Sequence, residues 1–405
     1  MSDRPPVEEP SAKRRKYESN DDEVEEKTEE ILRPFESESW SYEGKNILAP
    51  MVRIGTLPMR LLAQEYGADM CYGEELIDHK VMRLRRYSCS DGVVRFFNPN
   101  TVKKVIVGND DSDVLDINKN MKTIEEAVFA TKTEENVVFQ LGSADAARAV
   151  QAASVIANDV RAVDLNCGCP KTFSIQGGMG AALLKDPARL CDIVRSLRRN
   201  LSLPVTAKIR LLPDQRETIE LVRQIAACGV SAIGVHCRET TDRPQDSAQL
   251  SRMREIVDAS PVPIIHNGDI FHYSEFQSIR QASHVSSVMV ARGAMWNASI
   301  FRAEGYLPVY DVASRYVSIA KEVHNRPANT KYVLLSMLKT MRLGKTPAMR
   351  FFQNAKTNAD IDVALTQLAE EPRARMEYTP LLHYRVQDVL QGREIVTDYK
   401  KHPPQ

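Results

Sequence analysis

The sequence lacks the features that mark several protein classes. No run of about 18 apolar residues occurs in its 405 residues, so no membrane-spanning helix is expected. The polar N-terminus has no secretory apolar core. No CxxC pair occurs among the seven cysteines, and their spacing shows no disulfide framework. We therefore expect free thiols in a reducing, intracellular compartment, with no structural zinc, other metal site or membrane partner.

Net charge is also absent, because 54 basic residues balance 54 acidic ones. The two signs are nevertheless separated along the chain. Residues 1–45 hold eight Lys/Arg against 14 Asp/Glu, whereas residues 312–358 hold nine Lys/Arg against Glu322 alone. A basic segment of that strength attracts polyanions, so we expect it to face nucleic acid. A protein-binding surface is the alternative reading of the same charges.

The chain ends carry little pattern. Residues 1–44 have no apolar periodicity and are predicted to form a disordered, charged tail. Within this tail, Lys13-Arg14-Arg15-Lys16 resembles a nuclear-localisation patch, so a cytoplasmic or nuclear location, or both, is expected. Residues 399–405 are predicted to be frayed.

Between these ends, short apolar runs alternate with amphipathic helical patterns such as 186–200 and 216–229. Near-continuously hydrophobic strands separated by helices indicate a parallel sheet covered by helices. We predict an α/β protein with a (β/α)₈ TIM barrel over residues 45–308. A doubly wound open sheet is the alternative, but no GxGxxG follows the first strand. The predicted strands are 46–51, 69–73, 137–141, 162–166, 205–210, 232–237, 263–268 and 287–292.

Two segments depart from this repeat. Residues 79–131 are too long for a loop between a strand and a helix, and we expect a hairpin-bearing excursion beside the barrel mouth. After Pro308 the strand signals stop. Helical patterns at 311–325, 329–343 and 360–370 predict a small all-α domain over 309–398, which contains the basic segment.

The most informative run is DLNCGCPK at 164–171, followed by a glycine-rich turn. Cys169 comes just after a predicted buried strand, where α/β barrels place their catalytic groups. Its thiol is a candidate proton donor or nucleophile. The alternative is that Cys167 and Cys169 are small core residues, because free cysteines are often buried and inert.

Polar side chains cluster where the other predicted strands end, and these ends share one rim of a barrel. Asn-Gly-Asp after the seventh strand and Ala-Arg-Gly after the eighth suit phosphate capture. A phosphate site together with an amide and a cation is what flavin mononucleotide (FMN) requires, although other phosphorylated ligands fit too. The residues are Pro50, Met51, Gln140, Asn166, Lys208, Arg210, His236, Asn267, Gly268, Asp269 and Arg292.

The motifs together resemble one family, the tRNA-dihydrouridine synthases, and within it the eukaryotic type that acts on uridine 20 of the D-loop. The similarity extends from residue 46 to about 345. It is carried by the segment 48–77, FQLGS (139–143), DLNCGCPK with GGMGAALL, KIR, VHCR, HNGD, MVARGAMWNASIF and NTKY (329–332).

The resemblance implies an enzyme that reduces a tRNA uridine to 5,6-dihydrouridine with FMN and NADPH, acting as a monomer. It implies Cys169 as the catalytic acid, which protonates C5 after hydride reaches C6, and Asn166 as the group that contacts uracil. For tRNA it implies Arg210, Asn329, Lys331 and Arg350. For FMN it implies Pro50, Met51, Val52, Gln140, Lys208, His236, Asn267, Gly268, Asp269, Ala291 and Arg292.

Some animal relatives carry a double-stranded-RNA-binding module after the helical domain, and we expect none here. We therefore expect residues 312–358 to supply more of the tRNA affinity. Two alternatives remain open at this point: an FMN barrel that reduces a free pyrimidine, and a tRNA-binding barrel without catalysis.

Overall fold

The structure is a computed structural model that describes residues 32–33, 40–100, 114–117, 120, 124, 127–133, 135–339, 346–376 and 378. The described residues from Leu32 onward belong to one compact unit. The Lys13–Lys16 patch, most of the predicted tail and the predicted frayed end at 399–405 lie outside the described residues. None of the described helices is long and apolar enough to cross a membrane.

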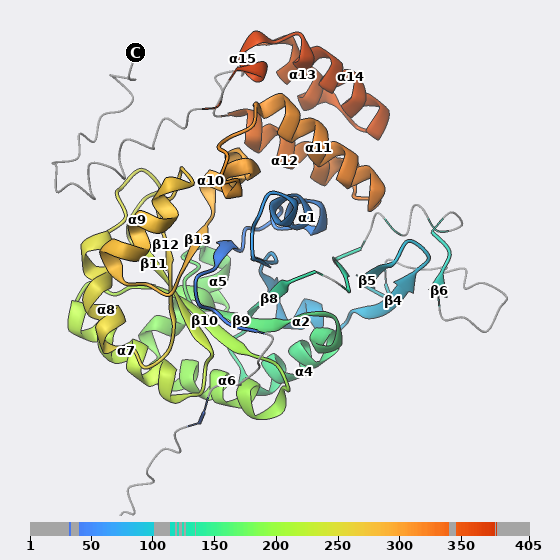
Figure 1. Ribbon diagram of the computed structural model, residues 1–405. Coiled ribbons are helices and arrows are strands. Elements are labelled where there is room, and N and C mark those ends of the chain that lie inside the picture. Colours follow the sequence, from blue (N-terminus) through green and yellow to red (C-terminus); the bar gives the residue numbers. More distant parts are fainter. Residues whose placement is uncertain are drawn as a thin grey trace, which may run out of the picture. The chain divides into compact units, whose positions relative to one another are not determined.

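Eight parallel strands close into a barrel (Figure 1), as the sequence predicts. Neighbours in the chain pair in parallel, β1 pairs with β13, and pairing of β2 with β8 completes the ring. The strands are β1 (Asn46–Leu48), β2 (Met70–Tyr72), β8 (Val137–Gly142), β9 (Ala162–Asn166), β10 (Val205–Leu211), β11 (Ala232–Glu239), β12 (Ile264–Asn267) and β13 (Ser287–Val290).

Alternate residues of each strand enter different parts of the core. In β9, Val163 and Leu165 join the large cluster shared with the surrounding helices, whereas Ala162 belongs to a second cluster, which includes Ala232 and Met289 of other strands. Because both faces of these strands are buried, their sequences are almost continuously hydrophobic. The exceptions lie on the second face, and they include Asp164 and Asn166.

Helices cover the outside of the barrel, and the predicted segments 186–200 and 216–229 correspond to α6 and α7. Aspartates begin three of them: the carboxylates of Asp145, Asp186 and Asp214 accept first-turn backbone N–H bonds of 2.8, 3.1 and 2.6 Å. The helices are α1 (Leu57–Glu65), α4 (Ala146–Ile156), α5 (Thr172–Gln176), α6 (Pro187–Asn200), α7 (Gln215–Ala227), α8 (Met253–Ala259), α9 (Ser274–Ser283) and α10 (Arg292–Trp296).

The predicted boundary of the disordered tail, at residue 44, lies too far toward the C-terminus. Tyr42 is only 3% exposed and joins the second core cluster, with Trp40 packed edge-on against its ring. Its carbonyl accepts a hydrogen bond from Ser287 Oγ, at the first residue of β13. These two aromatic side chains bury enough apolar surface to order the segment before β1.

The excursion contains the expected hairpin. Strands β4 (Arg85–Cys89) and β5 (Val93–Phe97) pair antiparallel, and β6 (Val114–Leu115) and β7 (Phe129–Lys132) complete a sheet of order β6-β4-β5-β7. Before it, β3 (Leu76–Ile77) extends the edge of β8, and α2 (Asp78–Val81) follows.

Helices follow the barrel, and α11 packs against α1 (Figure 1). Three of them match the predicted segments 311–325, 329–343 and 360–370, although 340–343 lie outside the described residues. The sequence analysis missed α13 and α15, which are short and begin with proline, a residue that otherwise signals a loop. The helices are α11 (Val309–Glu322), α12 (Pro327–Leu338), α13 (Pro347–Asn354), α14 (Asn358–Ala369) and α15 (Pro372–Arg375).

A buried ion pair joins α1 to the segment between β7 and β8. Arg60 and Glu135 are almost fully buried and bond through Nε. The same guanidinium donates to the carbonyls of Gly55 and Ala130 at 2.8 and 2.6 Å. Each of the three guanidinium nitrogens of Arg60 therefore has a hydrogen-bond acceptor, which offsets the cost of burying its charge.

Arg60→Met should lower the free energy of unfolding by about 3–5 kcal/mol, because Glu135 remains buried without its partner. Urea titration followed by circular dichroism measures the loss. The matched control is Arg254→Met, which breaks the exposed pair with Asp258 and should cost less than about 1 kcal/mol. Equal losses of unfolding free energy in the two variants would contradict a stabilising role for the buried Arg60–Glu135 pair.

Candidate functional site

The strand register brings the predicted site residues to one rim. Lys208 lies beside Asn166 of β9 and Gly234 of β11, and Arg210 lies beside His236. His236 is in turn beside Asn267. A Cβ at Gly234 would lie 3.2 Å from Lys208 Cγ, so glycine leaves room for the lysine side chain. The predicted groups from four consecutive strands are thus neighbours.

A polar network lies inside the barrel at Asp164, which is 1% exposed. Its carboxylate accepts from Gln140 Nε2 at 2.8 Å and from Thr206 Oγ1 at 2.7 Å. Because an ionised carboxylate only accepts, it fixes the Gln140 amide with its NH₂ group toward Asp164. Burial raises the pKa of Asp164. Burial and then the positive charge of Arg210 lower the pKa of Lys208.

A cavity of about 260 Å³ is lined by Arg210, His236 and Asn267, from the neighbouring strands β10, β11 and β12. Four arginines and two aspartates line it, which leaves an excess of positive charge. Burial, then Lys208 and Arg210, lower the pKa of His236 well below its usual value, so the imidazole is neutral near pH 7. The lining includes Arg210, His236, Asn267, Gly268, Asp269, Ala291 and Arg292, together with Arg238, Asp242 and Arg243.

Asp269 organises the cationic wall of this cavity. Arg238 Nη2 reaches its two carboxylate oxygens at 2.5 and 2.6 Å, and Arg292 Nη2 bonds to the same group. The backbone N–H of Ala248 donates to it as well, at 2.8 Å. Burial opposes ionisation of Asp269, but the charge and hydrogen bond of Arg238, the charge of Arg292 and the N–H of Ala248 together outweigh it and lower the pKa. Asp269 therefore orients the arginines.

The loop after β9 presents Cys169. Asn166 Oδ1 accepts from the backbone N–H groups of Gly168 and Cys169 at 2.9 and 3.1 Å. Arg210 Nε holds the Gly168 carbonyl at 2.9 Å. Cys169 is partly exposed, whereas Cys167 is fully buried and burial raises its pKa. Of these two thiols, only that of Cys169 is accessible to a ligand.

The remaining predicted cofactor residues lie on the turn after β1. Pro50 and Met51 are partly buried there, and Val52 is 43% exposed. The Met51 carbonyl accepts from Ile54 and Gly55, at 3.1 and 2.8 Å, and closes the turn.

The predicted tRNA contacts in the helical domain have different surroundings. Lys331 Nζ donates to the carbonyls of Gln353 and Ala355, at 3.3 and 2.8 Å, at the end of α13. Asn329 bonds to the turn after β1. Arg350 is exposed.

Sequence reasoning assigned no role to three site residues. Asp164 is the acidic residue in an otherwise apolar strand, and that contrast was a usable signal. Arg238 follows the predicted strand 232–237 directly. Glu75 has a buried Oε1 without a hydrogen-bond partner, and burial raises its pKa although a contact with Asn166 opposes the shift. No pattern in the sequence marks it.

The model of the family named "Dihydrouridine synthase (Dus)" matches residues 47–354. The chain belongs to the dihydrouridine synthase family. It is similar to a protein of Schizosaccharomyces pombe named tRNA-dihydrouridine(20) synthase (NAD(P)+), with 38% identity over 80% of this chain and 65% of that protein. A Saccharomyces cerevisiae protein of the same name is 34% identical over 83% of this chain and 87% of its own. A human tRNA-dihydrouridine(20a/20b) synthase-like protein is 26% identical over 68% of this chain and 76% of its own.

Arg238→Met should destabilise the protein in a pH-dependent way. The arginine lowers the folded-state pKa of Asp269, so its stabilisation is present above the unfolded carboxyl's pKa and is lost as pH falls. We expect a loss of about 3 kcal/mol near pH 7. The loss should be smaller near pH 4, because without Arg238 burial raises the pKa of Asp269 and the variant can protonate this carboxyl. Urea unfolding at both pH values measures it. An equal loss at both would contradict the role of Asp269.

Proposed function

We propose that this protein reduces a D-loop uridine of tRNA, at position 20, to 5,6-dihydrouridine, using FMN and NADPH. The observation that carries the proposal is the placement of Cys169. Its backbone is held by Asn166, and the adjoining Gly168 carbonyl by Arg210, which also lines the cationic cavity. Membership in the Dus family and the names of its relatives support the same reaction.

The residues fit FMN at both ends. The excess of arginine around the 260 Å³ cavity suits a phosphate monoester, with Arg292 and Arg238 as its cationic contacts. Deeper in the barrel, Gln140 supplies a fixed amide for the ring's polar edge, and Lys208 supplies a positive charge. We also assign Pro50, Met51 and Val52, on the turn after β1, to FMN. Bound FMN supplies hydride transfer, with NADPH as the source of electrons.

The chain's own residues complete the reduction. Saturating the C5–C6 bond of uracil requires a hydride at C6 and a proton at C5. The Cys169 thiol donates the proton at C5, and its partial exposure allows solvent to restore it. Asn166 and Arg210 are positioning residues, because they fix the backbone on both sides of the cysteine. The neutral His236 adds no further charge beside Lys208.

The helical domain supplies a surface for the tRNA backbone. Within the described residues of the basic segment, the side chains of Arg326, Lys339, Arg350 and Lys356 are exposed. Others are engaged inside the protein: Arg315 pairs with Glu65 and Lys321 with Asp362. The exposed group is therefore the part of the segment that we assign to phosphate contacts.

Cys169→Ala should retain FMN and lose at least about a hundredfold of dihydrouridine formation, because the proton donor to C5 is gone. Mass spectrometry of tRNA after incubation with NADPH measures the product. Cys167→Ala is the matched control and should keep nearly full activity. A fully active Cys169→Ala protein would overturn the assignment.

Arg350→Gln and Lys356→Gln should each weaken tRNA binding and reduce the slope of log affinity against log salt by about 1, as loss of one phosphate contact requires. Lys321→Gln, whose amine already pairs with Asp362, is the matched control and should leave the slope unchanged. Filter binding across a salt series provides the data. Unchanged slopes in both test variants would remove this surface from the tRNA interface.

A further inference from the structure

The turn that carries Pro50, Met51 and Val52 is held from outside the barrel. Asn329, in the first turn of α12, donates from Nδ2 to the Arg53 carbonyl at 2.8 Å. From the sequence, this asparagine is expected to contact tRNA. Its contact in the structure is instead with the loop that we assign to FMN.

Arg53 makes two further contacts. Its backbone N–H donates to Glu74 Oε2 at 2.9 Å, and its guanidinium lies 5.4 Å from the ring centroid of Tyr332, one helical turn after Asn329. Its φ is +65°, in the left-handed region that side chains other than glycine rarely adopt. This conformation costs energy, and the surrounding contacts offset it.

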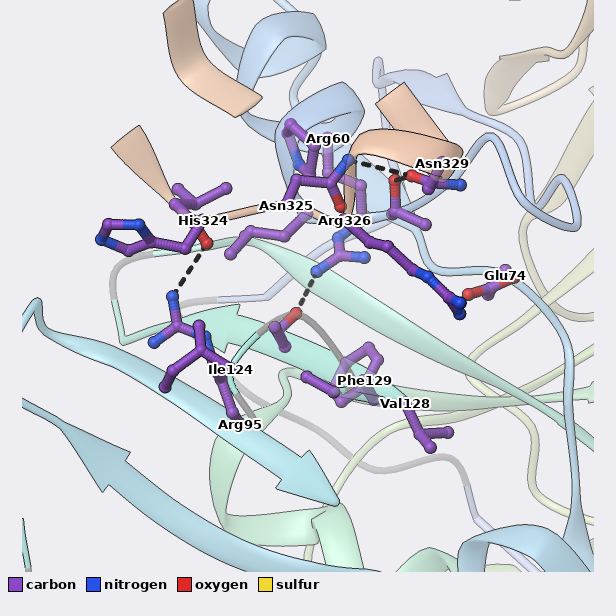
Figure 2. Close-up of a pocket in the computed structure, with 16 residues that line it drawn as sticks. Arg60, Glu74, Arg95, Ile124, Val128, Phe129, His324, Asn325, Arg326 and Asn329 are labelled. Carbon is purple, nitrogen blue, oxygen red and sulfur yellow. Dashed lines mark hydrogen bonds between the residues drawn. The ribbon is translucent and has the colours of Figure 1, made fainter. Parts of the chain in front are cut away.

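The orientation of Asn329 is determined by its partners, as Figure 2 shows in part. Its Oδ1 accepts from Asn325 Nδ2 at 3.1 Å and from Thr56 Oγ1 at 3.0 Å. A backbone carbonyl can only accept, so Nδ2 must face Arg53. One side chain therefore connects α12, the segment before it and both sides of the turn.

Thr56, Asn325 and Asn329 line one side of a second cavity, of about 170 Å³, to which α1 and the excursion also contribute (Figure 2). On its excursion side, Arg95 donates to the Val323 carbonyl at 2.8 Å. The helical domain is thus anchored to the excursion at one place and to the turn after β1 at another. Only the second anchor touches the proposed FMN site.

We propose that Asn329 is a positioning residue for the cofactor: from the helical domain it fixes the turn at 51–55 in the shape that receives FMN. The proposal rests on the proposed function, because it takes Pro50, Met51 and Val52 as FMN contacts. It couples the two domains. Through α12, the helical domain that bears the exposed basic surface also sets the affinity for the flavin.

Asn329→Asp tests this contact with no change in side-chain size. The carboxylate keeps the acceptor for Thr56 and Asn325, but it replaces the N–H donor with an oxygen that faces the Arg53 carbonyl. FMN titration of the apoprotein, followed by quenching of flavin fluorescence, should show affinity about tenfold weaker or worse. The apoprotein's affinity for tRNA should change less than about twofold.

Two control variants separate cofactor positioning from simple anchoring. Thr56→Val removes one Asn329 contact but leaves the Arg53 bond, so FMN affinity should stay within about twofold of wild type. Arg53→Gly keeps the carbonyl that accepts from Asn329, and glycine suits the left-handed conformation. FMN affinity should therefore stay within about threefold of wild type, although the contact with the Tyr332 ring is lost. Melting temperatures of the apoproteins monitor folding.

Wild-type FMN affinity in Asn329→Asp would overturn the inference. Equal losses of FMN affinity and melting temperature in Asn329→Asp and Thr56→Val would overturn it as well, because the asparagine would then act only as an anchor. Failure of the proposed function gives a different result: the wild-type protein itself would not bind FMN.

Discussion

Parallel closure of the barrel is the constraint on which the rest of the structure depends. Because β1 pairs with both β13 and β2, and β2 with β8, all eight strands point the same way and end at one rim. Residues more than two hundred positions apart in sequence become neighbours there. The second face of the strands is the barrel interior, so polar residues on it must satisfy one another or a ligand.

Two groups of charges meet that requirement differently. Asp269 is paired with Arg238 and Arg292, so the cationic wall exists before any ligand arrives. Asp164 instead has neutral hydrogen-bond donors, Gln140 and Thr206, and its burial raises its pKa. The first arrangement presents positive charge to an anion. The second arrangement fixes the orientation of the Gln140 amide. A fixed amide can recognise the hydrogen-bonding edge of a ring, which a charge alone does not do.

The sequence predicted the barrel well because periodicity is a local signal. Each apolar run of the strands and each aspartate before a helix can be recognised without knowing the fold. The strand-end motifs likewise located Cys169, Asn166 and the arginine-bearing loops. Contacts between distant elements left no such signal: nothing near Asn329 indicates that it bonds to Arg53, and nothing before β1 indicates that Tyr42 enters the core. The tail boundary and the roles in the helical domain needed the structure for that reason.

The central claim is that the Cys169 rim and the basic helical domain serve one reaction on tRNA. The most direct test is to map dihydrouridine, at single-nucleotide resolution, in tRNA from cells that lack this protein. The account predicts loss of dihydrouridine at position 20 of the D-loop, and its return when the wild-type chain is expressed. An unchanged map would contradict the account.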